Sequence, residues 1–111
     1  MISTHVLDTS SGRPATGLVV ALEVQVAGSH WQPVASASTN GDGRVPELAS
    51  GAALAGKTCR LRFETGDYFR ARGLAGFFPY VEVVFVVESE LDRYHVPLLL
   101  SPFGYSTYRG S

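Results

Sequence analysis

The 111-residue chain has the composition of a folded domain, with 45% hydrophobic and 17% charged residues, and we treat residues 1–111 as one domain. Its net charge of −1 and its dispersed arginines exclude the basic surface that nucleic-acid binding needs. No apolar run reaches the ~18 residues of a membrane span, and the first residues show no signal-peptide pattern, so we expect a cytoplasmic protein that does not enter a membrane.

Alternating apolar and polar residues predict two strands near the N-terminus. In the first, His5 shares a face with Ser3 and Leu7. In the second, residues 20–26 place valine and leucine on one face and alanine, glutamate and glutamine on the other. This pattern is typical of a half-buried strand.

A third predicted strand covers residues 31–38, where Pro33 favours a sheet edge or a bulge. The Asn-Gly-Asp-Gly sequence at 40–43 is the strongest turn signal in the chain. It is also reminiscent of a calcium loop. If Gly43 is the glycine that such a loop requires, however, Ala49 stands where the bidentate glutamate belongs. We therefore expect no calcium site.

Two more strands are predicted further along the chain. Residues 59–64 alternate, with Cys59 on the apolar face. A single cysteine excludes an internal disulfide and a thiolate metal cage, and we interpret it as a small buried hydrophobe rather than a catalytic thiol. Residues 81–87 are apolar on nearly both faces, which indicates a central strand or one covered by a partner.

Residues 65–73 interrupt the alternation and predict one short helix, near residues 66–72. Thr65 or Asp67 is the candidate N-cap, and Gly73 is the stop signal. Several strands and one short helix in a domain of this length indicate an all-β fold, an antiparallel β-sandwich.

The last predicted long strand, residues 93–100, has two apolar faces of different character. Its core face is formed by Tyr94, Val96, Leu98 and Leu100. The opposite face carries His95, Pro97 and Leu99, so an ionisable ring lies among apolar groups on the outside of a small sandwich. Such a surface usually marks an interface, and we expect a homo-oligomer in which another subunit covers it.

The C-terminal segment 104–111 is unusually rich in hydrogen-bonding side chains for a chain end, which suggests a site. If it extends as a strand, its side chains alternate between two faces. One face would carry Tyr105, Thr107, Arg109 and Ser111, the last with its carboxylate, and the other would carry Ser106 and Tyr108.

Histidine is the natural acid–base group near neutral pH, and the chain has three histidines. His30 lies in a predicted turn and is interpreted as a solvated loop residue. His5 or His95 alone would more often be structural than catalytic. Two histidines on two strands, one of them followed by a polar tail, favour a catalytic site.

Two familiar kinds of site do not fit. Ser106 begins a G-x-S-x-G nucleophile elbow, but Tyr108 replaces the second glycine. The histidines also lack metal-ligand spacing, so we expect no metal.

Arg44 alone would usually be a solvated charge. Imidazoles, a guanidinium and hydroxyls together suit the activation of water against a small, planar, nitrogen-rich carbonyl compound.

Four segments match a known pattern: Ser-Thr-His-Val-Leu-Asp at 3–8, Asn-Gly-Asp-Gly-Arg at 40–44, Tyr-His-Val-Pro-Leu-Leu-Leu-Ser-Pro at 94–102 and Tyr-Arg-Gly-Ser at 108–111. Through them the chain resembles the hydrolase branch of the transthyretin-like family over nearly its whole length, and residues 65–69 and 77–79 also fit. The terminal tetrapeptide is highly specific when the two histidines accompany it.

The resemblance implies a transthyretin-like sandwich of two four-stranded sheets with one short helix. It also implies a homotetramer with active sites in clefts where dimers meet. The implied reaction is the hydrolysis of 5-hydroxyisourate, the unstable product of urate oxidation, to 2-oxo-4-hydroxy-4-carboxy-5-ureidoimidazoline, without a cofactor. The family's catalytic histidines match His5 and His95, and its arginine matches Arg44. Arg93 stands where the family often has a histidine, on the face of His95.

On this interpretation His5 and His95, with the hydroxyl or carboxylate of Ser111, hold and deprotonate a water that adds to a ring carbonyl. Arg44 orients the substrate and offsets negative charge on its oxygen, while Arg109 shapes the pocket. The substrate-binding residues that the resemblance implies are Arg44, Tyr108, Arg109, Gly110 and Ser111.

Two other functions remain open. A carrier of small molecules, as transthyretin is for thyroid hormone, needs the same fold but apolar or neutral residues in place of the histidines and the terminal motif. A generic adhesive or regulatory β-sandwich would explain the strands but not the polar tail.

Overall fold

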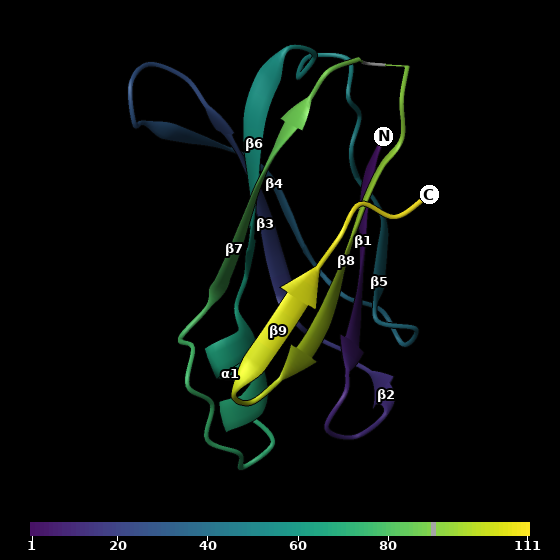
Figure 1. Ribbon diagram of the computed structural model, residues 1–111, viewed down its shortest axis with the longest axis vertical. Coiled ribbons are helices and arrows are strands. Elements are labelled where there is room, and N and C mark those ends of the chain that lie inside the picture. The colour runs from purple at the N-terminus through teal and green to yellow at the C-terminus, as the bar shows by residue number, and fades with distance from the viewer. Residues whose placement is uncertain (90) are drawn as a thin grey trace.

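A computed structural model describes residues 1–89 and 91–111 and shows two sheets packed face to face with one short helix (Figure 1). The first sheet runs in the order β2-β1-β8-β9, with β5 also paired to β1, and the second runs β4-β3-β6-β7. The first contains β1 (Ile2–Asp8), β2 (Arg13–Pro14), β5 (Arg44–Ala49), β8 (Tyr94–Ser101) and β9 (Gly104–Thr107). The second contains β3 (Val19–Gln25), β4 (Trp31–Ser38), β6 (Lys57–Phe63) and β7 (Val81–Val87). The predicted all-β sandwich is confirmed.

The first sheet differs from the prediction in two details. It has five strands rather than four, because the two-residue strand β2 pairs with the end of β1. The strands β1 and β8 are parallel, whereas the other pairs of described strands are antiparallel. Alternation shows which face of a strand is buried but not the direction of its neighbour, so the sequence pattern could not reveal this pair.

The core lies between the sheets and is formed by the faces that alternation predicts. On β8 the buried core residues are Tyr94, Val96, Leu98 and Leu100. Cys59 on β6 is fully buried among such side chains, and burial raises the pKa of its thiol. This confirms the interpretation of Cys59 as a small core side chain, because a reactive thiol needs exposure and a lowered pKa.

The predicted turn at 40–43 is present and sets the start of β5. The side-chain oxygen of Asn40 accepts hydrogen bonds from the backbone N–H groups of Asp42 (2.9 Å) and Arg44 (3.0 Å). Gly43 has a φ of +73°, and a Cβ there would lie 2.5 Å from the carbonyl oxygen of Val6. Glycine is therefore required for both reasons. The turn delivers Arg44 as the first residue of β5.

The second sheet has β4 and β7 at its two edges. The register of β3 with β4 shifts next to Pro33, which confirms the predicted edge position and bulge. The apolar strand β7 is not central, so that part of the prediction is wrong. Val84 and Val86 on β7 are 56% and 53% exposed. The other alternative, cover by a partner, stays a prediction for this apolar edge strand.

The helix α1 (Thr65–Arg70) is shorter than predicted and begins differently. Its N-cap is Glu64, without a side-chain capping hydrogen bond, and the two predicted caps, Thr65 and Asp67, lie inside the helix. The reason is that the helix starts two residues after the end of β6, so Glu64 is the only residue between them and takes the cap position. Gly73 has a φ of +71° and follows the helix, as predicted for a stop signal. In the part of the chain that the structure describes, no helix is long and apolar enough to span a bilayer.

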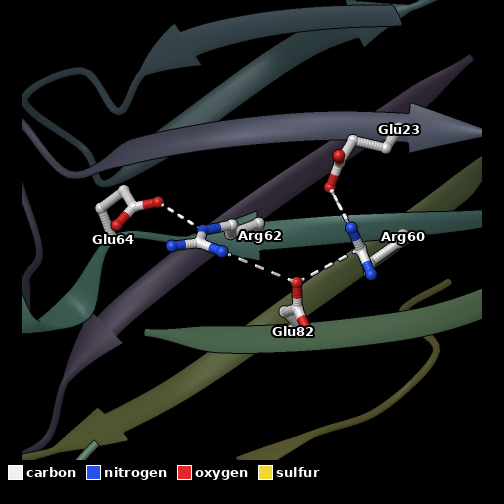
Figure 2. A network of polar contacts seen from close by, with 5 residues as sticks. All are labelled: Glu23, Arg60, Arg62, Glu64 and Glu82. Atoms are coloured by element: carbon white, nitrogen blue, oxygen red, sulfur yellow. Dashed lines mark hydrogen bonds and ion pairs between the residues drawn. The ribbon is translucent and has the colours of Figure 1, made fainter. Parts of the chain in front are cut away.

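A paired network of charges covers part of the outer face of the second sheet (Figure 2). Arg60 contacts Glu23 at 2.9 Å and Glu82 at 3.3 Å, and Arg62 contacts Glu64 at 2.6 Å and Glu82 at 3.9 Å. These side chains remain 20–35% exposed, so water screens the pairs and each contributes little to stability. Arg60 and Arg62 on β6 thus neutralise neighbouring carboxylates.

A buried carboxylate anchors the helix to the first sheet. Asp8, only 3% exposed at the end of β1, accepts a 2.9 Å hydrogen bond from the hydroxyl of Tyr68 on α1. Burial alone would raise the pKa of Asp8, but hydrogen bonds from Ser10, Tyr68 and the backbone outweigh it and lower the pKa below 3.8. Burial and the bond to Asp8 raise the pKa of Tyr68 to about 12, so its hydroxyl stays a donor at neutral pH.

We predict that Tyr68→Phe lowers the free energy of unfolding by about 1–3 kcal/mol at pH 7, because a buried carboxylate loses a donor. The contribution of Asp8 is present above its unfolded pKa of 3.8 and is lost as pH falls through its lowered folded pKa. Urea unfolding at pH 7 measures the effect. Tyr80→Phe is the control, since the Tyr80 ring is 39% exposed. Equal stabilities of the two variants would contradict the prediction.

Candidate active site

The pairing of three strands brings the predicted catalytic residues together. In the parallel β1–β8 pair Ser3 lies opposite His95, and in the antiparallel β1–β5 pair His5 lies opposite Arg44. Side chains two residues apart on a strand share a face, so Ser3 and His5 lie on one side of the sheet. Their register partners extend this group on both sides of β1.

A cavity of about 280 Å³ opens over this part of the sheet. Met1 and Ser111, the two ends of the chain, both line it, and Figure 1 shows the two termini close together in its view. Its lining includes Met1, Ser3, Arg44, Arg93, His95 and Ser111. Three predicted residues, Arg44, His95 and Ser111, therefore share one cavity, and Arg93 joins His95 there as its position on the strand predicts.

The ring of His95 is half-buried and is fixed on two sides. Its Nδ1 lies 2.9 Å from the Ser3 hydroxyl oxygen. The backbone N–H of Gly110 donates a 2.8 Å hydrogen bond to the carbonyl oxygen of His95. A Cβ on Gly110 would lie only 2.5 Å from Cδ2 of the ring. The close approach of the tail to His95 thus requires glycine at position 110. This is a structural reason for the glycine in the terminal motif.

The surroundings keep His95 neutral. Burial lowers its pKa below 6.5, and the positive charge of Arg44 and the neighbouring His5 lower it further. Arg44 shares the cavity with His95, whereas His5 is not among its lining residues and lies opposite Arg44 in the β1–β5 pair. A neutral imidazole can accept a proton from water, and a nearby guanidinium can stabilise an oxyanion. The arrangement therefore has the parts needed for hydrolysis of a carbonyl compound.

The terminal motif does not continue the alternation between two faces predicted for an extended strand over residues 105–111. The strand β9 ends at Thr107, and the tail rejoins β8 only at the bridge between Gly110 and His95. Ser111 lines the cavity with Arg44, whereas Arg109 lines a second cavity of about 200 Å³. The expected common face of Arg109 and Ser111 is therefore wrong, because residues after Thr107 leave the regular strand.

The second cavity lies on the β7 side of the tail. Thr107, Tyr108 and Arg109 all line it, and His95 contributes to both cavities. The guanidinium of Arg109 stacks over the ring of Tyr94, at 4.8 Å from its centroid. In this single chain, Tyr108 and Arg109 are thus separated from Arg44, and their roles toward a substrate remain predictions.

Sequence reasoning did not assign a role to Ser3, although it placed Ser3 on the face of His5. The missing information was the parallel register that sets Ser3 beside His95. A serine two residues before a candidate catalytic histidine was the available signal. His30 is exposed in its loop, as expected for a solvated side chain.

Comparison with known proteins covers the full chain. A family model described as "Transthyretin: HIUase/Transthyretin family" matches residues 2–110. The 5-hydroxyisourate hydrolase of Mus musculus is 46% identical over 111 residues, which span 99% of this chain and 94% of that protein. The 5-hydroxyisourate hydrolase of Salmonella dublin is 43% identical over 111 residues, 100% of this chain and 81% of that protein.

Two solved structures show the same fold. Klebsiella pneumoniae 5-hydroxyisourate hydrolase has a TM-score of 0.86 and 36% identity, with 99% of this chain and 98% of that chain covered. Sea bream transthyretin in complex with thyroxine has a TM-score of 0.92 and 28% identity, with 98% and 93% covered. The backbone is thus similar to both proteins, while the sequence is more similar to the hydrolase.

We predict that the imidazole of His95 titrates below pH 6.5 and that Arg44→Gln moves its pKa upward, because the variant removes a positive charge next to the ring. NMR titration of the histidine ring protons measures both values. Arg70→Gln, on the exposed side of α1, is the matched control and should leave the pKa unchanged. A wild-type value at or above 6.5 would show that burial and charge do not act on His95 as described.

Proposed function

The chain belongs to the HIUase/transthyretin family, and we propose that it hydrolyses 5-hydroxyisourate to 2-oxo-4-hydroxy-4-carboxy-5-ureidoimidazoline in urate and purine catabolism, without a cofactor. The observation that carries the proposal is a neutral, half-buried His95 in one cavity with Arg44 and Ser111. The identity of the substrate is inferred from the relatives named 5-hydroxyisourate hydrolase.

In the proposed reaction an imidazole accepts a proton from a water while the water oxygen bonds to a ring carbonyl carbon. The carbonyl electron pair moves onto oxygen, where the guanidinium of Arg44 stabilises the negative charge. Collapse of this intermediate breaks the ring C–N bond, and the nitrogen takes the proton from the imidazolium. His95 is the proposed base, His5 assists it, and Ser111 helps to hold the water.

Tyr108, Arg109 and Gly110 complete the proposed substrate-binding set with Arg44 and Ser111. Gly110 acts through its lack of a side chain, which lets the tail lie against the ring of His95. Tyr108 and Arg109 face the second cavity in the single chain. Their proposed contribution therefore needs a site that is completed where subunits meet.

The alternative function is a carrier without catalysis. The similarity to sea bream transthyretin in complex with thyroxine, at a TM-score of 0.92, is the observation that favours it. A fold does not determine function, however, and the site residues must decide. A cavity lined by Arg44, Arg93 and His95 suits a polar, anionic ligand and proton transfer better than storage of an apolar ligand.

We further propose a homotetramer with active sites at the dimer–dimer interface. Exposed apolar side chains support assembly: Val84 and Val86 lie on the edge strand β7, and Tyr105 is 43% exposed on the edge strand β9. Both strands belong to the edge of the sandwich where the second cavity lies. Cover by other copies of this chain would protect these strands from unspecific pairing.

A cytoplasmic location is also part of the proposal. The buried, free thiol of Cys59 supports it, because structural cysteines of proteins in oxidising compartments are commonly paired in disulfides.

We predict that His95→Asn lowers the rate of hydrolysis by ~10²–10⁴ without unfolding the protein, because it removes one positioned acid–base group. The assay generates 5-hydroxyisourate from urate with urate oxidase and follows its ultraviolet decay. His30→Asn, at an exposed loop position, is the matched control and should keep full activity. Full activity of His95→Asn would remove His95 from the mechanism. Thyroxine binding by a wild-type chain without hydrolase activity would support the carrier.

We predict that sedimentation equilibrium gives the mass of four chains and that specific activity falls on dilution as the assembly dissociates, because the proposed site is shared between subunits. A monomer with undiminished activity would contradict both the tetramer and the shared site.

A further inference from the structure

We infer that Ser3 is a positioning residue for His95: its hydroxyl accepts the Nδ1–H of the imidazole and so leaves Nε2 as the nitrogen that takes a proton from water. The expected effect on kcat rests on the proposed hydrolysis, whereas the hydrogen bond between Ser3 and the His95 ring does not. It starts from the 2.9 Å contact between the Ser3 oxygen and Nδ1 of His95.

The position of Ser3 is set by backbone hydrogen bonding and not by a flexible loop. Ser3 and His95 are register partners in the parallel β1–β8 pair, with five further pairs on one side of them and one on the other. Both residues are half-buried. A side chain held by a strand can orient its partner more accurately than one held by a loop, because its backbone is fixed on both sides.

The C-terminal tail at Gly110 covers the Cδ2–Cγ edge of the His95 ring. The close approach of Gly110 covers Cδ2 and Cγ, where a Cβ would lie at 2.5 and 3.2 Å. With Nδ1 engaged by Ser3, the open edge of the imidazole is Cε1 and Nε2. Nε2 is therefore the ring nitrogen left to meet a bound water or substrate.

The direction of the Ser3 hydrogen bond decides what the ring can do. A hydroxyl can donate or accept, and a neutral imidazole has one donor and one acceptor nitrogen. If Ser3 donates to Nδ1, the proton resides on Nε2 and the ring can act there only as an acid. If Ser3 accepts from Nδ1–H, Nε2 is unprotonated and basic. When Nε2 then takes a proton, the same hydroxyl continues to stabilise Nδ1–H of the imidazolium.

The positive charge around the His95 ring makes the Ser3 hydroxyl important as an acceptor for Nδ1–H. Burial lowers the pKa of His95, and Arg44 and His5 lower it further, so a group that stabilises the protonated ring offsets part of their effect. The other charged or titratable groups that share a cavity with His95 are the Met1 amino group, Arg93 and the Ser111 carboxylate in the first, and Glu88, Tyr94, Tyr108 and Arg109 in the second.

The first test reads the ring directly. In protein with ¹⁵N-labelled histidine, the two nitrogen chemical shifts report which nitrogen carries the proton in neutral His95. We expect a protonated Nδ1 and an unprotonated Nε2 in the wild type, and loss of this preference with a lower pKa of His95 in Ser3→Ala. Protonation on Nε2 in the wild type would overturn the inference. This result does not depend on any substrate, so it decides the role of Ser3 even if the proposed hydrolysis fails.

The second test reads catalysis. We expect Ser3→Ala to lower kcat by about 10–100-fold with little change in KM, as removal of a group that orients a functional histidine does. Ser3→Thr retains the hydroxyl on a residue that suits a strand, and it should restore most of the rate. Ser36→Ala, an exposed serine on β4 in the other sheet, is the control and should be unchanged.

The outcomes separate the two proposals. Wild-type kcat in Ser3→Ala would overturn the positioning role while leaving the hydrolase intact. Absence of activity in the wild type would reject the hydrolase, and the nitrogen shifts would still settle Ser3. Unchanged far-ultraviolet circular dichroism and rescue by Ser3→Thr would distinguish orientation of the ring from loss of folding.

Discussion

The parallel pairing of β1 with β8 is the constraint on which the site depends. A parallel neighbour cannot be reached by a tight turn, because the chain must return to the end at which it started. Here the connection includes the whole second sheet and the helix, so the first strand, β1, pairs with the next-to-last strand, β8, in the middle of the first sheet (Figure 1). Their register fixes Ser3 against His95. A shift of either strand by one residue would move its side chain at this pair to the core face and break the contact.

This pairing also explains how the outer face of β1 and β8 can carry polar groups without weakening the core. The inner faces of β1 and β8 are buried in the sandwich and hold the register, as the full burial of Ile2 and Leu98 shows. The outer faces are then free to carry polar groups without loss of the core. Sea bream transthyretin, crystallised with thyroxine, and Klebsiella pneumoniae 5-hydroxyisourate hydrolase share this frame with TM-scores of 0.92 and 0.86. The chemistry therefore resides in the side chains that the frame holds.

Local sequence patterns predicted the buried faces of strands and the position of the turn. The order of the strands and the path of the C-terminal tail depend on tertiary pairing, which these patterns do not show. Alternation along residues 93–100 identified the buried face of β8, and the Asn-Gly-Asp-Gly signal located the turn before Arg44. Alternation could not show that β7 is an edge strand or that Arg109 leaves the face of Ser111. The first depends on which strands pair, and the second on one bridge between Gly110 and His95. The resemblance carried by the terminal motif predicted the site residues, whereas the contact of Ser3 with His95 depends on the parallel register of β1 and β8.

The positive charge around His95 has two opposite consequences for the proposed chemistry. Burial and, after it, Arg44 lower the pKa of the ring, which favours its neutral form but makes it a weaker base. The same guanidinium stabilises the oxyanion that forms when water adds to a carbonyl. The weaker basicity acts on every proton transfer, whereas the stabilisation grows only as charge develops on the substrate oxygen. Because catalysis depends on interactions that are stronger in the transition state than in the ground state, this arrangement favours the reaction as long as the ring keeps a partner for its other N–H. Nδ1 has that partner in Ser3, so the strand pairing that builds the sandwich also supplies the hydrogen bond that the base requires.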